Sequence, residues 1–415
     1  MTKKEIIETA YKVWGREFYL NTSLSHVASE LKVCKPALYR HFSNKNALLE
    51  AMTRHFFDDF SGFIQADFEK AMKTEDKSKS VFALIGSITE YYTRNVYLFI
   101  FSMTVLNDPK LDSFNMLEEL CLRGIDMESF HSSIKKEYVF EPLVMRLIFA
   151  TLTFYMANFH NMRDSLANPP DEAGISKIIN VIDAIIGKGL GYTDTEIKFV
   201  NYEKLENSIL GKVNTIDDDP LLKAVASAVA EAGPWQASME QVAKRSGLSK
   251  SSLYSHFKNK QDMLHQLFMT ESMRLLDFAR RQIKQSEVPQ EQLYLGIFSI
   301  AEYLRSKPDI LVALDWIRNR KLDFRPAGHK HKEPMIGFFS LFDVIDIKPL
   351  QNKDSPFREI PIGEKENFNI SPWILFLIIR TLMGREPGHT FGDVPNSDIR
   401  ALFRFITLGI GGFKQ

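Results

Sequence analysis

The stretch Val33-Cys-Lys-Pro-Ala-Leu-Tyr-Arg-His-Phe-Ser-Asn-Lys45 returns 215 residues later as Leu248-Ser-Lys-Ser-Ser-Leu-Tyr-Ser-His-Phe-Lys-Asn-Lys260. Seven of the thirteen positions are identical, and the agreement continues on both sides. The flanking matches are Ser23 with Ser238, Val27-Ala28 with Val242-Ala243, and Leu49 with Leu264. A match of this length at a fixed offset indicates an internal duplication.

The later parts of the chain also correspond, and in the same order. The matching segments are Ile85–Tyr91 with Ile297–Tyr303, Pro142–Ile148 with Pro372–Ile378, and Ile178–Leu190 with Ile399–Ile410. The whole chain therefore reads as two repeats of about 200 residues, with a seam near the acidic run Asp217–Pro220.

Apolar residues recur at the i, i+3, i+4 spacing of amphipathic helices nearly throughout the chain. No alternating run bounded by tight-turn dipeptides indicates a strand. The predicted fold class is all-α: two tandem units, each a three-helix helix-turn-helix domain followed by a helical domain. The predicted domains are 1–55, 56–200, a linker over 201–219, 220–270 and 271–415.

Each repeat opens with the pattern of three short helices. The first helix is predicted over Ile6–Phe18 and Leu221–Ala232, and a serine N-cap begins the second. A tight turn leads to the third, predicted over Lys35–Phe42 and Lys250–Phe257. This arrangement is a helix-turn-helix, whose last helix can enter the major groove of DNA.

The formal net charge of the chain is zero, so a nucleic-acid partner must be argued from local charge. Residues 32–45 and residues 244–260 contain lysines and arginines and no acid. One such patch alone would be read as a solvated helix face. Two acid-free basic patches at equivalent positions are instead the electrostatic footprint expected for phosphate contact.

The motif resembles the N-terminal domain of the TetR family of regulators. The resemblance rests on Ser23-Leu-Ser-His-Val-Ala28 and Lys35–Lys45, and on Ser238-Met-Glu-Gln-Val-Ala243 and Gly247–Lys260; it covers residues 1–55 and 216–270. It implies a DNA-binding transcription regulator in which each helical remainder serves ligand binding and dimerisation. We call residues 1–55 the first head and residues 220–270 the second head.

The resemblance implies DNA contacts at matching positions. Contacts to phosphate are implied for Ser23, Ser238, Tyr39, Tyr254, His41, His256, Lys45 and Lys260. Base edges or the adjacent backbone would be faced by Lys35, Pro36, Ala37 and Arg40, and by Lys250, Ser251 and Ser252. Packing alone is the alternative for the tyrosines and histidines. Core packing is preferred for Leu38, Leu253, Phe42 and Phe257.

The two heads differ at the turn and on the reading surface. Lys32 stands where the second head has Gly247, a residue suited to left-handed backbone. Cys34 replaces Ser249 and is a poorer helix cap, which Pro36 partly offsets. The reading surfaces also differ, because Pro36-Ala37 and Arg40 replace Ser251-Ser252 and Ser255. Unequal half-sites are therefore predicted rather than a perfect palindrome.

Proteins of the family act as homodimers, so the fusion predicts a single-chain pseudo-dimer with Ile178–Leu190 and Ile399–Ile410 in its internal interface. The alternatives are a homodimer with four heads and a first head that docks protein instead of DNA. The expected partners are a double-stranded DNA operator and an apolar or amphipathic effector, and the resemblance favours repression over activation. Aromatic residues that could line a pocket are read as core first: Tyr91, Tyr92, Phe99, Phe101, Phe154, Tyr155, Trp316, Phe338, Phe339 and Trp373.

Other classes of protein find little support in the composition. The two cysteines, Cys34 and Cys121, do not make a disulfide scaffold and fit a cytoplasmic location. The sequence contains no phosphate-binding glycine loop, metal-ligand spacing or nucleophile motif. We therefore expect a protein that is not an enzyme and that binds no cofactor. The longest charge-free apolar stretch, Leu147–Met162, falls short of the roughly 20 residues of a membrane span.

Overall fold

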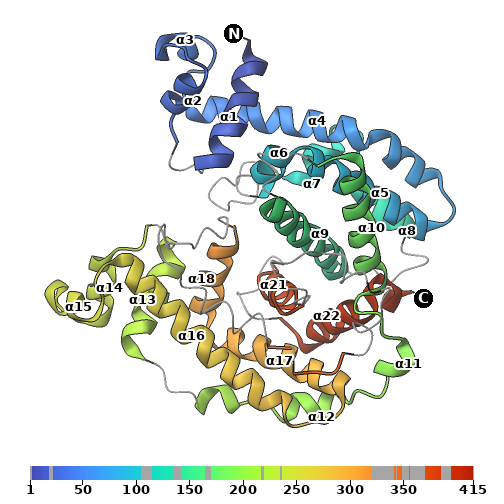
Figure 1. Ribbon diagram of the computed structural model, residues 1–415, viewed down its shortest axis with the longest axis vertical. Helices are drawn as coiled ribbons and strands as arrows, with labels where there is room; N and C mark the ends of the chain where they lie inside the picture. The colour runs from blue at the N-terminus through green and yellow to red at the C-terminus, as the bar shows by residue number, and fades with distance from the viewer. Residues whose placement is uncertain are drawn as a thin grey trace. The chain divides into compact units, whose positions relative to one another are not determined.

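The computed structural model describes residues 2–17, 22–103, 115–134, 142–163, 170–215, 219–233, 236–319, 341–342, 344–347, 355, 370–384 and 394–414. These residues form helices and, within the described ranges, no strand, which confirms the all-α prediction (Figure 1). Phe338, Phe339 and the side chain of Trp316 lie outside what is described.

The first repeat contains twelve labelled α-helices in the described ranges: α1 (Lys3–Glu17), α2 (Leu24–Glu30), α3 (Lys35–Tyr39), α4 (Lys45–Lys73), α5 (Lys77–Arg94), α6 (Val96–Phe101), α7 (Met116–Cys121), α8 (Met127–Ile134), α9 (Pro142–Arg163), α10 (Glu172–Lys188), α11 (Asp194–Ile197) and α12 (Tyr202–Asn207). A 3-10 helix, η4 (Lys212–Thr215), follows.

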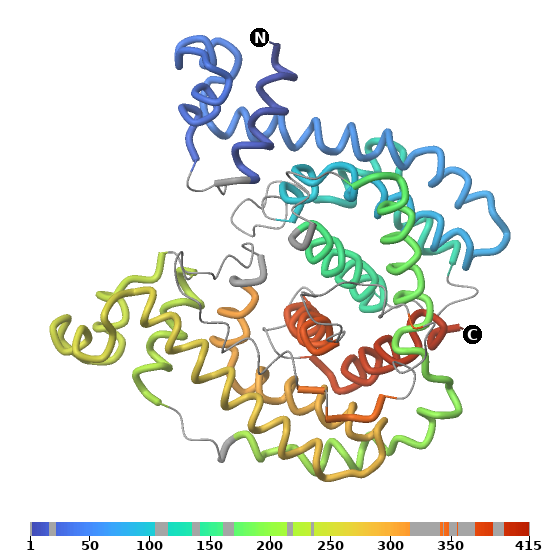
Figure 2. Tube along the Cα trace, in the orientation of Figure 1, coloured from blue at the N-terminus to red at the C-terminus, as the bar shows by residue number. Residues whose placement is uncertain are grey.

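The second repeat contains α13 (Pro220–Ala232), α14 (Met239–Ser246), α15 (Lys250–His256), α16 (Lys260–Ile283), α17 (Pro289–Ser306), α18 (Pro308–Asn319), α21 (Ser371–Leu382), α22 (Asn396–Leu408) and the 3-10 helix η6 (Gly409–Phe413). Figure 2 follows the same order by residue number. In both repeats three short helices precede one long helix, α4 or α16.

The chain divides into two compact units. Unit 1 comprises Met1–Phe140, Met156–Asp183 and Gln415, and unit 2 comprises Glu141–Tyr155 and Ala184–Lys414. This division passes through α9 and α10 rather than through the seam at 217–220. The boundaries expected after residues 55 and 270 fall inside the continuous helices α4 and α16.

The core of unit 1 is rich in aromatic side chains between α4 and α5. The Phe60 ring meets the Tyr91 ring edge-on, with 5.0 Å between centroids. The Tyr91 hydroxyl donates to Asp59 Oδ2 at 2.9 Å. Tyr92, Phe99 and Phe101 are also buried, so the core reading of these residues is confirmed.

Unit 2 places the first part of α9 against α21. Trp373 is fully buried, and its Nε1 donates to Thr151 Oγ1 at 3.2 Å. The Trp373 ring lies 6.1 Å from that of Tyr155, and Phe154 lies 5.5 Å from Phe376. A helix from the first repeat therefore contributes directly to the core built by the second.

The segment expected to be a linker is also held in unit 2, through Glu206 of α12. Glu206 is buried and accepts two hydrogen bonds from Arg400, from Nε at 2.7 Å and from Nη2 at 2.8 Å. Tyr294 and Asn396 donate to the same carboxylate, at 2.5 Å and 3.0 Å. Burial raises the pKa of Glu206, but these hydrogen bonds outweigh it, so the pKa lies below its ordinary value.

The end of α10 meets the end of α22 through two glycines, again inside unit 2 (Figure 2). A Cβ atom on Gly189 would lie 2.4 Å from the Ile406 carbonyl oxygen, and one on Gly409 would lie 2.4 Å from the Ile186 carbonyl oxygen. Both glycines have positive φ, 52° and 61°. The amide of Leu190 donates to the Ile406 carbonyl at 2.7 Å. The contact is thus reciprocal and too close for any side chain.

One stretch of α9, Pro142–His160, is long and apolar enough to cross a membrane by length and composition alone, with a mean hydropathy of 1.3. Half of this stretch is buried inside the fold. Core helices of soluble proteins pass the same test, so it is weak support for a membrane span.

Candidate nucleic-acid interface

The first head is built by α1, α2, α3 and the start of α4. Val27 and Leu38 are fully buried and Phe42 nearly so, which fixes α2 and α3 against α1. These positions leave Tyr39 on the outer face, with 51% of its surface exposed. The core reading of Leu38 and Phe42 is confirmed.

The second head repeats this arrangement with α13, α14, α15 and the start of α16. Val242 and Leu253 are fully buried, and Phe257 is 2% exposed. Tyr254 is 49% exposed, almost the same fraction as Tyr39. The duplication has therefore kept both the core and the outward tyrosine.

The predicted contact residues lie on the outer side of each head. In the first head the exposed ones are Ser23, Lys35, Pro36, Tyr39 and Arg40, and the half-buried ones are Ala37, His41 and Lys45. In the second head the exposed ones are Lys250, Ser251, Tyr254 and His256, and the half-buried ones are Ser238, Ser252 and Lys260. The structure brings each set together on and around α3 or α15.

Lys45 has a structural role besides the predicted one. Its Nζ donates to the Thr22 carbonyl at 2.7 Å and lies 5.8 Å from the centre of the Trp14 ring. Burial lowers the pKa of Lys45, and it lowers the pKa of Lys260 in the same way. Lys45 therefore ties the loop before α2 to the start of α4, and any contact with phosphate would add to this bond.

The turn before the recognition helix has the same backbone in both heads. Gly247 has φ 69°, and Lys32 has φ 56° and is the one non-glycine residue with positive φ in the described part of the chain. A side chain in this region costs roughly 1–2 kcal/mol. The first head therefore keeps the turn geometry and carries the strain of a non-glycine residue at this position.

Helix capping also differs between the heads, as predicted from Cys34 and Ser249. Ser249 accepts a hydrogen bond from the Ser252 amide at 3.1 Å, whereas Cys34 makes no side-chain cap bond. Ser238 and Gln241 form a reciprocal capping box on α14, and Ser23 makes no cap bond on α2. Both helices of the second motif are thus better capped than those of the first.

The motif repeats an asparagine just before the long helix of each repeat, Asn44 and Asn259. Asn44 caps α4 by accepting from the Ala47 amide at 2.8 Å, and Asn259 caps α16 by accepting from the Asp262 amide at 2.9 Å. An asparagine just before a long helical pattern is a recognisable N-cap signal.

The positive charge of the acid-free segment 244–260 in the second head is partly neutralised in the structure, because Arg245 forms an ion pair with Glu231 of α13.

The first head is attached to the helices behind it through Tyr11 of α1. The Tyr11 hydroxyl donates to the Met52 carbonyl on α4 at 2.6 Å. The Tyr11 ring meets Phe101 of α6 edge-on at 5.0 Å. In unit 2 the corresponding first helix, α13, packs on α18. A shift of α6 would therefore move α1 of the first head, and a shift of α18 would move α13 of the second head.

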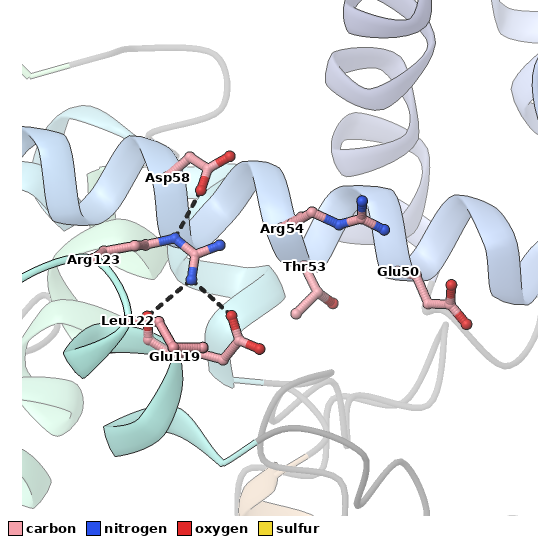
Figure 3. Close-up of a pocket in the computed structure, with 7 residues that line it drawn as sticks. All are labelled: Glu50, Thr53, Arg54, Asp58, Glu119, Leu122 and Arg123. Carbon is pink, nitrogen blue, oxygen red and sulfur yellow. Dashed lines mark hydrogen bonds and ion pairs between the residues drawn. The ribbon is translucent and has the colours of Figure 1, made fainter.

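A charged surface hollow of about 610 Å³ lies beside α4 (Figure 3). Arg123 crosses it and pairs with Asp58 and Glu119, each at 2.7 Å. Glu50 and Arg54 project from the next turns of α4. The hollow is lined by Glu50, Thr53, Arg54, Asp58, Glu119, Leu122 and Arg123. Such a lining does not match the apolar effector pocket expected from the sequence.

Comparison with known proteins gives the same two segments. The family described as bacterial regulatory proteins, tetR family, matches residues 6–52 and again residues 221–267. The uncharacterized HTH-type transcriptional regulator YuxN of Bacillus subtilis (strain 168) is 41% identical over 56 residues, covering 14% of this chain and 19% of that protein. The fatty acid metabolism regulator protein of the same strain is 25% identical over 133 residues, covering 32% of this chain and 67% of that protein.

The chain thus spans about a fifth of the first of these relatives and two thirds of the second. Each family match begins a repeat and ends within its long helix, so it covers the core, the turn and the recognition helix of one head. On these grounds the chain carries two tandem copies of the helix-turn-helix domain of the tetR family of bacterial regulatory proteins.

Proposed function

We propose that this protein is a transcription regulator that binds a double-stranded DNA operator with both heads and represses by occupying it. The observation that carries the proposal is the repeated outer surface: two recognition helices with half-exposed tyrosines, Tyr39 and Tyr254, amid acid-free basic sequence. Lysines, hydroxyl groups and helix N-termini together are the groups that contact DNA phosphates.

We further propose that one chain acts as a pseudo-dimer. The reciprocal approach of Gly189 and Gly409 supports this, because a two-fold interface is one in which residue i meets residue j and j meets i. Here the two partners belong to different repeats of the same chain. Covalent linkage replaces dimerisation by an intramolecular contact with a high effective concentration.

The two heads should read unequal half-sites. Arg40 of the first head is exposed and can reach a guanine or a phosphate. In the second head, the Ser255 hydroxyl donates to the Ser252 carbonyl at 2.6 Å, and Ser251 shares a hydrogen bond with Ser249 at 2.9 Å. The side chains of the second reading surface are therefore shorter than Arg40, and some of their hydroxyl groups already make hydrogen bonds within the head. This difference between the heads favours an asymmetric operator.

Release from DNA would follow ligand binding to the helical part of a repeat. A ligand that prefers one arrangement of α6 or α18 would bias the first helix of the head through contacts such as Tyr11 with Phe101. An amphipathic effector fits the expectation better than a purely polar one.

Separate substitutions of Tyr39→Phe and Tyr254→Phe test the proposal. Each removes one hydroxyl without changing the ring, and a hydrogen bond to a charged phosphate is worth about 1.5–3 kcal/mol, or roughly 10-fold or more in affinity. Equal losses support two working heads, and a loss at Tyr254 alone supports the alternative of a first head that docks protein. Unchanged affinity in both variants would refute DNA binding through these heads.

Light scattering tests the pseudo-dimer separately. The chain mass is 47.7 kDa, and a particle of that mass is expected for the protein free of DNA. A stable particle of twice that mass would favour the homodimer with four heads. Operator selection from random DNA provides the check on half-site asymmetry, since a perfect palindrome would contradict it.

A further inference from the structure

Two arginines from different repeats lie half-buried in unit 2. Arg146 belongs to α9 and Arg380 to α21. The Nε of Arg146 is buried and makes no hydrogen bond. Its guanidinium lies against Gly384, where a Cβ atom would stand 2.7 Å from Nη1 and 2.8 Å from Cζ. The glycine leaves the room that the guanidinium occupies.

The charge around these arginines is not balanced by the described residues. Burial lowers the pKa of Arg380, nearby Arg146 lowers it further, and Asp315 of α18 acts in the opposite direction. Among the described residues, Arg380 therefore has one carboxylate and one further guanidinium acting on it. An arginine does not escape burial by losing its proton, so unbalanced charge here has to be neutralised by an anion or remain unfavourable.

Apolar rings stand one helical turn from each arginine. Phe149 follows Arg146 on α9 and is 40% exposed. Phe376 precedes Arg380 on α21 and is half-buried, with its ring 5.5 Å from Phe154. Residues three or four apart share a helix face. The same faces therefore offer fixed positive charge and an apolar surface.

We propose that Arg146 and Arg380 bind the oxyanion head of an amphipathic ligand, a carboxylate or a phosphate, with its apolar part along Phe149 and Phe376. The planar guanidinium presents paired donors that match two oxygens of such a head. The inference deepens the ligand response proposed above and rests on it for the effect on DNA, but binding of the anion itself does not depend on DNA.

The site occurs once per chain. In the alignment of the repeats, Arg146 of Pro142–Ile148 corresponds to Phe376 of Pro372–Ile378. At the same offset, Arg380 corresponds to Ala150. Neither repeat supplies the pair by itself, so one ligand per chain is expected.

The test measures binding of decanoate, decyl phosphate and decan-1-ol to the full chain by calorimetry, in wild type and in Arg146→Gln and Arg380→Gln. Arg281→Gln is the matched control, because Arg281 is exposed at the end of α16 in the same unit. We expect at least one of the two anions to bind with one site per chain. Each arginine variant should weaken it about 10-fold or more, while Arg281→Gln binds as wild type does. The two anions decide between a carboxylate and a phosphate head.

Two further readouts separate a binding site from a structural one. Removing an unbalanced charge should leave the ligand-free melting temperature of Arg380→Gln unchanged or higher, whereas a structural role predicts a lower one. Operator binding by ligand-free Arg146→Gln should equal that of wild type, so a failure of the anion site is distinguishable from a failure of DNA binding. The proposal is overturned if decan-1-ol binds as tightly as the anions, if neither anion binds, or if both variants bind like wild type.

Discussion

Replacing Gly189 by alanine should break the internal two-fold contact. The new Cβ would stand 2.4 Å from the Ile406 carbonyl oxygen, 2.7 Å from the Gly409 amide nitrogen and 2.8 Å from the Phe405 carbonyl oxygen. All three neighbours are backbone atoms, so no rotamer change relieves the clash. The ends of α10 and α22 would have to separate.

Two effects set the size of the loss. Alanine at φ 52° costs roughly 1–2 kcal/mol from the backbone alone. Forcing a methyl group into a closed contact adds about 1–3 kcal/mol. The expected loss in the free energy of unfolding is therefore about 2–5 kcal/mol. Separation of the helices also lengthens the 2.7 Å hydrogen bond from the Leu190 amide to Ile406.

Gly211→Ala is the matched control, because Gly211 has φ 80° but no atom within 4 Å of its Cβ position. Urea unfolding of both variants separates the two effects: Gly211→Ala should lose only the backbone share, about 1–2 kcal/mol. Gly189→Ala should also bind operator more weakly, since the two repeats no longer hold a fixed arrangement. Equal losses in the two variants would refute the close contact and, with it, the main support for the pseudo-dimer.

Four further substitutions test backbone strain at the turns, the buried carboxylate of Glu206 and the buried imidazole of His160. Lys32→Gly should stabilise the first head by about 1 kcal/mol and Gly247→Lys should destabilise the second by a similar amount, both measured by urea unfolding, because each changes the residue at a left-handed position. Glu206→Gln should cost about 2 kcal/mol at pH 7, with exposed Glu203→Gln as a silent control. Because the folded pKa of Glu206 is depressed, this difference should fade as the pH falls below 4.5. Burial lowers the pKa of His160 to about 4, although its hydrogen bond to the Tyr92 carbonyl partly opposes this shift. The free energy of unfolding should therefore fall by up to ~3 kcal/mol as the pH falls from 6.5 to 4. In thermal melts at a series of pH values, His160→Gln should show a weaker dependence of stability on pH.

The sequence predicts the heads well because their structure is local. The spacing of Leu38 and Phe42 gives the buried face, and the same spacing at Leu253 and Phe257 gives it again. The turn required a left-handed residue in both copies, so the geometry of Lys32 followed from its alignment with Gly247. Capping by Asn44 and Asn259 has an equally local signal in the sequence, an asparagine directly before a long helical pattern.

Features that depend on distant parts of the chain were not predicted. Glu206 lies in a segment that reads as an acidic linker, and its burial depends on Arg400, which is 194 residues away. Arg146 and Arg380 can lie near each other only because α9 and α21 belong to the same unit, and no pattern within either helix indicates this. Both repeats have glycines near the ends of the matching segments Ile178–Leu190 and Ile399–Ile410, but only the structure brings Gly189 to Ile406.

The strained first head requires a compensating interaction within its own core. The left-handed Lys32 and the missing caps of α2 and α3 together cost on the order of 2–4 kcal/mol relative to the second head. Trp14 of α1 aligns with Val229 of α13, and both are buried. The larger ring buries roughly 50–100 Å² more apolar surface, worth about 1–2 kcal/mol. The Tyr11 hydroxyl bond to the Met52 carbonyl, at 2.6 Å, adds about 1 kcal/mol at a position where the second head has Ala226. The first head thus depends on contacts of α1 where the second depends on its turn and caps. Since α1 also packs on α6, a change in α6 should alter the contacts that stabilise the first head.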